Sequence, residues 1–168
     1  QRFGIAESYV FDKVNWWTSS NSVDVNYTIS KFDIPQEEED QKGFNAIIST
    51  NNDFILNADK TLLLHLGYWY SFDGIDDIFD IKAMSSLSLS LQLLLLNKNL
   101  NITLAGTDIF RGENDVFALT VNGVYQEGRY YYDSRSFRLS VSYRFGNKNL
   151  KARAHKTGNQ RERGRSGY

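Results

Sequence analysis

Apolar and polar side chains alternate with a period of two along most of the chain. The row is clearest after Met84, where every second residue is leucine and the residues between are serine or glutamine. This period is typical of a β-strand with one apolar and one polar face, whereas a helix needs apolar residues at i, i+3, i+4 and i+7. The sequence therefore predicts an all-β protein with about seven spans, near 1–12, 16–32, 44–56, 61–72, 83–96, 100–110 and 136–145.

The connections between these spans alternate between short and long. Short turns are expected at 13–15, 57–60 and 97–99, and longer connections at 33–43, 73–82 and 111–135. An antiparallel up-and-down meander with tight turns on one rim and long loops on the other is typical of a transmembrane β-barrel. Residues 116–132 are also strand-forming. We expect them to form a hairpin arm near 112–135 within the last outer loop, and the alternative is an eighth membrane strand.

Three features favour a membrane barrel over a soluble one. The spans are about 10 to 13 residues long, which is enough for a tilted membrane crossing. The polar row is rich in serine, threonine and asparagine and poor in charge, as suits a lumen wall. Aromatic residues gather at span ends as expected of two interfacial girdles, formed by Trp16, Trp17, Tyr68, Tyr70 and Phe72. The expected lipid-facing row is Leu87, Leu89, Leu91, Leu93 and Leu95.

The main alternative is a soluble ligand-binding β-barrel or sandwich, which would pack the leucine row inside. Helical membrane spans are excluded, because the longest purely apolar run is the four residues 93–96. The lack of cysteine excludes disulfides and thiolate metal sites. Seven basic side chains and one acid fall within 146–168. We therefore divide the chain into a barrel segment, 1–146, and a basic, flexible tail, 147–168.

Several segments resemble the C-terminal part of TonB-dependent-receptor-like outer-membrane β-barrel proteins of the Bacteroidota type. They are the last span with its extension, 136–148, the tail segment 156–159, the span end Thr107-Asp108-Ile109-Phe110-Arg111 and the turn 13–17 with its double tryptophan. The span end is similar to an Asn-Asp-Ile-Phe motif of that family, with threonine in place of asparagine. The resemblance implies a barrel of about twenty-two strands around an N-terminal plug, with a receptor or transporter function for a ligand that the sequence does not identify.

The resemblance also implies location and partners. The protein would lie in the cell outer membrane with its tail in the periplasm. Its partners would be outer-membrane lipid, the barrel-assembly machinery, the TonB system acting through the plug, and the plug and N-terminal strands of the same protein, which we expect before Gln1. The closing strand, with Phe137, Leu139, Val141, Tyr143 and Phe145, is similar to the signal that the assembly machinery reads. A structural or adhesive barrel without uptake is the alternative.

No constellation of residues in the sequence predicts an enzyme, a cofactor, a metal site or nucleic-acid binding. No serine lies in a G-x-S-x-G turn, and His65 and His155 belong to different regions. We read the acidic residues Asp73, Asp76, Asp77 and Asp80 as solvated loop rather than a calcium site, because the spacing of an EF-hand is missing. The inward-facing Arg138 and Arg144 are expected to pair with Asp24 or other lumen acids, or to contact the plug.

Overall fold

The computed structural model describes residues 1–31, 41–121 and 123–145. Regular structure in these ranges consists of antiparallel β-strands, which confirms the all-β fold class. No helix in them is long and apolar enough to cross a membrane. The strands are β1 Arg2–Val14, β2 Trp17–Ser30, β3 Gln41–Ile55, β4 Leu62–Ser71, β5 Gly74–Asp76, β6 Phe79–Ile81, β7 Met84–Leu95, β8 Leu100–Thr107, β9 Asn114–Val121, β10 Val124–Tyr131 and β11 Ser136–Tyr143.

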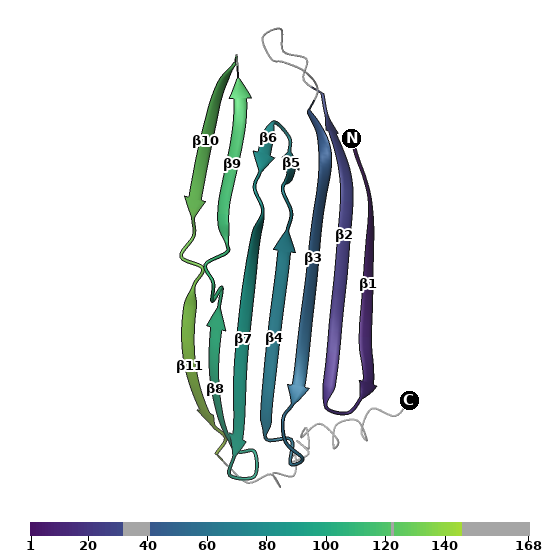
Figure 1. Cartoon of the computed structure of the whole chain (residues 1–168). Coiled ribbons are helices and arrows are strands. Elements are labelled where there is room, and N and C mark those ends of the chain that lie inside the picture. The colour runs from purple at the N-terminus through teal and green to yellow at the C-terminus, as the bar shows by residue number, and fades with distance from the viewer. Residues whose placement is uncertain (32–40, 122, 146–168) are drawn as a thin grey trace, which may run out of the picture.

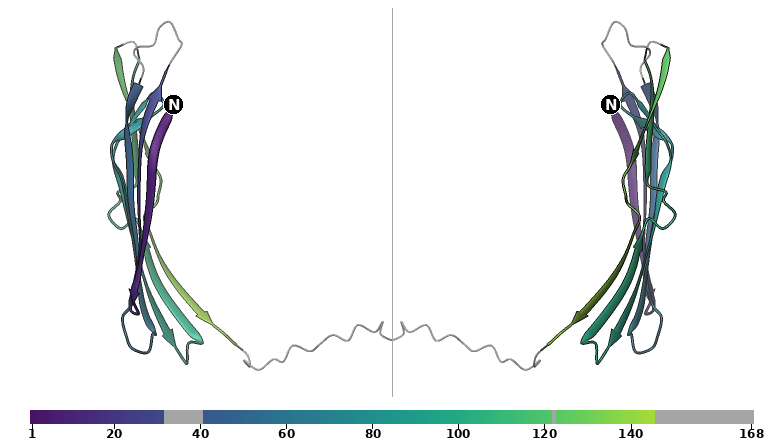
Figure 2. Two further views of the ribbon diagram at one scale, coloured as in Figure 1. Left: turned by 90° about the vertical axis from the view of Figure 1, so that its right-hand side faces the viewer. Right: turned by 90° about the vertical axis from the view of Figure 1, so that its left-hand side faces the viewer.

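Seven long strands form one sheet in the order β1-β2-β3-β4-β7-β8-β11 (Figure 1). Each neighbouring pair is antiparallel, so the chain runs up and down as a meander, and the strands coincide with the spans that the period-two pattern predicts. Seen from the side, the sheet is a curved, open wall (Figure 2). The wall does not close on itself: β1 and β11 are its edge strands.

The register gives this wall one apolar and one polar face, because side chains alternate across a strand. One apolar row crosses six strands through the paired residues Trp17, Phe54, Leu64, Leu91, Leu104 and Leu139. The adjacent row points the other way and is largely polar: Thr18, Asp53, His65, Ser90, Ala105 and Arg138. The two sides are called the apolar face and the polar face below.

Tight turns join the strands at the lower rim of the wall (Figure 1). In the turn after β3, Asn57 Oδ1 accepts hydrogen bonds from the backbone N–H groups of Thr61 (2.9 Å) and Leu62 (3.0 Å). This explains the asparagine at the start of that turn, since its side chain replaces a backbone acceptor. The turn expected at 13–15 lies slightly later, at Asn15 and Trp16, because an irregularity in β1 between Phe11 and Val14 shifts the register.

A second sheet of four strands, in the order β10-β9-β6-β5, lies at the upper rim (Figure 1). β9 and β10 form a hairpin, here called the arm, within the range where the sequence predicts one. They pair with each other and, through β9, with β6, and neither joins the seven-stranded sheet. The short β5–β6 hairpin was not expected from the sequence. Its Ile75 packs against Gly43 on the polar face, where a Cβ at Gly43 would lie 2.6 Å from Ile75 Cδ1.

The wall has almost no buried apolar interior. Among the described residues, Ala118 is the one hydrophobic side chain that is fully covered. By contrast, Leu104 is 54% exposed, Leu139 is 68% exposed and Phe137 is 69% exposed, all on the apolar face. A continuous exposed apolar surface of this extent requires a covering layer, because its contact with water is unfavourable.

Candidate functional site

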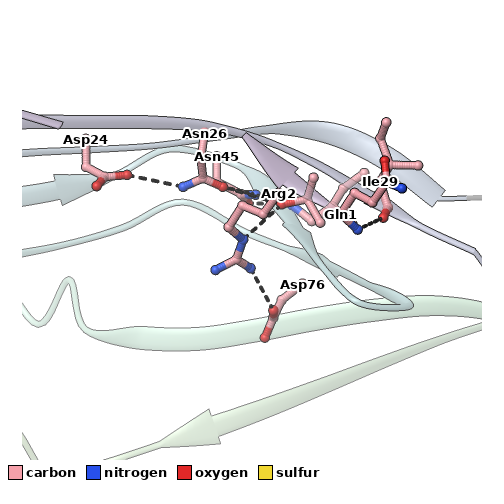
Figure 3. Close-up of polar contacts among 9 residues, drawn as sticks. Gln1, Arg2, Asp24, Asn26, Ile29, Asn45 and Asp76 are labelled. Carbon is pink, nitrogen blue, oxygen red and sulfur yellow. Dashed lines mark hydrogen bonds and ion pairs between the residues drawn. The ribbon is translucent and has the colours of Figure 1, made fainter. Parts of the chain in front are cut away.

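The densest polar network lies on the polar face near the upper rim, where β1, β2, β3 and β5 meet (Figure 3). Asn45 Nδ2 donates to Asn26 Oδ1 and to Thr28 Oγ1, both at 3.2 Å. Asn45 Oδ1 accepts the backbone N–H of Ile75 at 2.8 Å, which ties β5 to the wall. Asn26 Nδ2 also donates to Asp24 Oδ1 at 3.2 Å. The asparagine side chains therefore link three strands through both their donors and their acceptors.

Arg2 adds the charged part of this network. Its Nε donates to Thr28 Oγ1 at 3.3 Å, and its Nη2 lies 3.6 Å from Asp76 Oδ1, on β5. Both side chains of this ion pair are more than half exposed, so it holds β5 only weakly. A hollow of about 180 Å³ lies beside it, and both polar and apolar side chains line it, among them Arg2, Asn26, Asn45, Phe72, Ile75 and Ile81. This hollow can hold a small polar group.

Lower on the polar face, His65 Nδ1 lies 2.8 Å from Asp53 Oδ1, and Ser90 stands opposite His65 in the register. The order Asp, His, Ser resembles a nucleophilic triad. However, no hydrogen bond joins Ser90 to His65 in the described structure, and the strand N–H groups around them are engaged in the ladder. Acyl transfer needs free donors to stabilise an oxyanion. The described contacts therefore supply neither the serine–histidine hydrogen bond nor the oxyanion donors that acyl transfer requires.

A buried carboxylate fixes the chain where β8 ends. Asp108 is 1% exposed, and its backbone is in the left-handed region with a φ of 45°. Its Oδ1 accepts the N–H of Gly112 at 2.8 Å, and its Oδ2 accepts the hydroxyl of Ser134 at 2.6 Å and the N–H of Glu113 at 3.4 Å. These contacts join the two ends of the arm and are here called the Asp108 clamp. They give a structural role to the motif Thr107–Arg111.

The base of the arm carries a second cluster. Nε and Nη2 of Arg111 donate to the hydroxyl oxygen of Tyr131 at 3.0 and 2.5 Å, and the guanidinium carbon lies 5.1 Å from the centre of the Tyr131 ring. These bonds raise the pKa of Arg111 above its ordinary value. Asn114 Nδ2 donates to the backbone oxygen of Arg111 at 2.7 Å. Together with Arg129, these residues line a hollow of about 360 Å³.

A comparison with known families bears on what covers the apolar face. The sequence profile of the outer membrane protein beta-barrel family matches residues 1–143. The chain belongs to this family. No match was found among curated proteins or among solved structures. The seven-stranded sheet is therefore part of the wall of an outer-membrane barrel. Since a membrane barrel turns its apolar row to lipid and its polar row to the lumen, we expect the apolar face to contact lipid and the polar face to line the lumen, and they are called the lipid face and the lumen face below.

The membership accounts for the exposed leucine row. Leu89, Leu91 and Leu93 each pair with residues on both neighbouring strands of the lipid face. Leu91 remains 41% exposed and Leu95 39% exposed. Leu87 faces Tyr68 in the register. In the soluble alternative this row would be packed inside, whereas here no layer of the described chain covers it.

The aromatic residues expected in girdles lie toward opposite ends of the wall. Trp16 is in the lower turn and Trp17 begins β2. They stack with Phe54, at ring-centroid distances of 6.4 and 6.1 Å. Near the upper end of β4, the rings of Tyr70 and Phe72 meet edge to face at 4.7 Å. Tyr68 lies further down β4, opposite Thr50. Their depth in the membrane stays a prediction.

The closing strand lies at the edge of the wall. β11 pairs with β8 only, so its other edge has no partner within the described residues. The residues expected to be read during assembly are all substantially exposed: Phe137 69%, Leu139 68%, Val141 64%, Tyr143 46% and Phe145 85%. The rings of Tyr143 and Phe145 meet edge to face at 4.7 Å. The tail, 147–168, lies outside the described residues.

Two features of the wall differ from expectation. Asp24, one of the partners expected for Arg138 and Arg144, does not lie beside Arg138, because β2 and β11 are separated by four strands of the sheet. Pairing with other lumen acids or contact with the plug stays a prediction. The lipid face also carries polar side chains on β2 and β3, which the expected apolar row does not include. There, Trp17 Nε1 donates to Asn52 Oδ1 at 3.0 Å, and Asn52 Nδ2 donates to Thr50 Oγ1 at 2.9 Å. Because these groups satisfy one another, they can face an apolar environment at reduced cost.

Proposed function

We propose that this chain is a wall segment of a TonB-dependent receptor that takes up a ligand through a plug-filled lumen. The observation that carries the proposal is the upper lumen face, where β5 folds against β3 and the network of Arg2, Asn26, Asn45 and Asp76 borders a small hollow with both polar and apolar lining. A wall that only anchors a protein in the membrane has no need of a loop tied inward over a polar network. Side chains of this kind suit contact with a polar solute or with a plug.

The open edges of the sheet support a larger barrel. β1 and β11 each leave one edge without a partner in the described residues. Each unsatisfied N–H or C=O group of a strand edge in lipid costs several kcal/mol. We therefore propose that further strands of the same protein pair with these edges, and that a plug domain fills the lumen and contacts TonB.

Further parts of the proposal follow from the family resemblance of the closing strand and tail. We propose that β11 with Phe145 is read by the barrel-assembly machinery, and that the basic tail lies in the periplasm. The exposure of the closing-strand side chains supports the first of these, since a recognition strand must be accessible. Neither an enzymatic activity nor a cofactor is part of the proposal.

Conductance separates a plugged receptor from an open pore. We expect the whole protein, reconstituted in a planar lipid bilayer, to conduct little, because the plug fills the lumen, and to open reversibly when urea loosens the plug. The purified periplasmic domain of TonB should bind the same preparation. Steady open channels without urea, or no binding of the TonB domain, would contradict the receptor proposal and favour a pore or a structural barrel.

A further inference from the structure

The cluster at the base of the arm has the composition of an anion site. Asn114 pairs with Tyr131 in the β9–β10 register, and Val116 pairs with Arg129, so Arg129 and Tyr131 share one face of the arm. Arg111 reaches the same place from the loop after β8, with a φ of 57°. Two guanidinium groups and a phenol thus border one hollow of about 360 Å³.

This hollow presents unused donors. Tyr131 accepts two bonds from Arg111, which leaves its own O–H free to donate. Arg111 uses only Nε and Nη2 in these bonds, so further N–H groups stay available. The contact of Arg129 Nη2 with Glu127 Oε1 is long, at 3.9 Å, and the side chain of Arg129 is 66% exposed. Several donors around one open space match the oxygens of a phosphate group.

The register also shows which way the site faces. Ile75, Asp80, Ala118 and Glu127 are consecutive cross-strand partners, so they share a face of the four-stranded sheet. Arg129 lies two residues after Glu127 on β10 and therefore belongs to the same face. The Ile75 side chain packs against the lumen face of β3 at Gly43. The face of the four-stranded sheet that carries Arg129 and Tyr131 therefore points in the same direction as Ile75, which is away from the lumen.

The site stands at the upper limit of the lipid face. The segment after Tyr131 leads directly into β11, where Phe137 and Leu139 face lipid. Two exposed aromatic side chains lie at this boundary, Phe110 (77% exposed) and Tyr132 (62% exposed), as is common at membrane interfaces. The rim with the longer connections faces outward in outer-membrane barrels. A phosphate within reach here belongs to the headgroup layer of the outer leaflet.

We propose that Arg111, Arg129 and Tyr131 bind a phosphate group of an outer-leaflet glycolipid and so hold the arm against the membrane surface. Glu127 and Asp133 lie close to these arginines and keep the local charge near neutral. Binding therefore depends on directed hydrogen bonds more than on net positive charge, and should fall only modestly with added salt. This inference does not depend on the receptor function.

The test uses the whole protein in detergent micelles, titrated with diphosphoryl lipid A and with the same lipid after removal of its phosphates. Bound lipid is counted by native mass spectrometry. The first variant is Arg129→Gln, because Arg111 also anchors Tyr131 and its loss could unfold the arm. Arg138→Gln, on the lumen face of β11, removes the same charge as a matched control. Hydrogen exchange of β9 and β10 verifies that the arm stays folded.

We expect the phosphorylated lipid to bind the wild type and Arg138→Gln equally, and Arg129→Gln roughly tenfold more weakly. Equal binding of the phosphorylated and phosphate-free lipids would overturn the proposal, as would an equal loss in both variants. A third arm adds inorganic phosphate alone. If Arg129→Gln weakens the binding of inorganic phosphate but not of the lipid, the site is one for free phosphate, and the lipid assignment is wrong.

Discussion

The Asp108 clamp offers a direct test of what holds the arm in place. The change is Asp108→Ala, which removes the carboxylate that joins Gly112 and Glu113 at one end of the arm to Ser134 at the other. The side chain is 1% exposed, so the groups that it releases do not immediately face water. We expect the arm to open more often while the seven-stranded wall stays folded.

The magnitude follows from the bonds that are lost. The contacts to Gly112 at 2.8 Å and Ser134 at 2.6 Å are short and charge-assisted, and such bonds contribute about 1.5–3 kcal/mol each. The contact to Glu113 at 3.4 Å adds little. Because the released groups are hydrated once the arm opens, the net loss should be about 2–3 kcal/mol. Local opening then becomes roughly 30-fold to 140-fold more frequent.

Hydrogen–deuterium exchange measures this opening strand by strand. In Asp108→Ala, the amides of β9 and β10 should exchange faster by that factor, and those of β2 to β4 should not change. The control Asp59→Ala removes a carboxylate from an exposed turn, outside the Asp108 clamp. It should leave the exchange rates of all strands as in the wild type. Unchanged exchange in the arm of Asp108→Ala would refute the clamp. Faster exchange throughout the wall would show that Asp108 stabilises the barrel itself.

Three further predictions concern other contacts. Gly112→Ala should detach the loop from β7, since an added Cβ would overlap a backbone oxygen of that strand, and limited proteolysis should then cut the loop faster. The hydrogen bond to Glu127, followed by desolvation, raises the pKa of Tyr125. Glu127→Gln should lower the pKa of Tyr125 again, as measured by an absorbance titration. In the wild type, the stability of the arm should fall as the pH rises above the ordinary pKa of a phenol. Leu91→Arg should make the free energy of folding into lipid less favourable by about 2–4 kcal/mol, and Ser90→Arg should have a much smaller effect on it.

The strands could be predicted because their pattern is local. Most of the long strands show a period-two row in the sequence, with β1 and β3 less clear than the others, and a membrane barrel strengthens that row by placing one face in lipid. The turn after β3 could also be predicted, because an asparagine such as Asn57 can accept backbone hydrogen bonds within a turn. The short β5–β6 hairpin could not be found in this way, since three-residue strands carry no readable period and Ile75 is placed by its packing on Gly43.

The site residues were harder to predict because they meet across long separations in the sequence. Arg2 and Asp76 are brought together only when β5 folds over the wall, and Arg111 meets Tyr131 only when the arm closes. The sequence marked Asp108 as part of a family-like motif, without indicating that its carboxylate binds Ser134. Asp24 was wrong as one of the partners expected for Arg138, because two side chains on the same face of a sheet are close only when their strands are neighbours.

Spin labelling tests most directly whether the leucine row faces lipid and the serine row faces the lumen. The chain has no cysteine, so single cysteines at Leu91 and Ser90 allow a clean comparison by spin labelling of the whole protein in lipid vesicles. We expect the label at position 91 to collide readily with dissolved oxygen and hardly with a water-soluble nickel chelate. The label at position 90 should show the lower oxygen accessibility. Equal accessibility at both positions, or the reverse order, would contradict this orientation of the two rows.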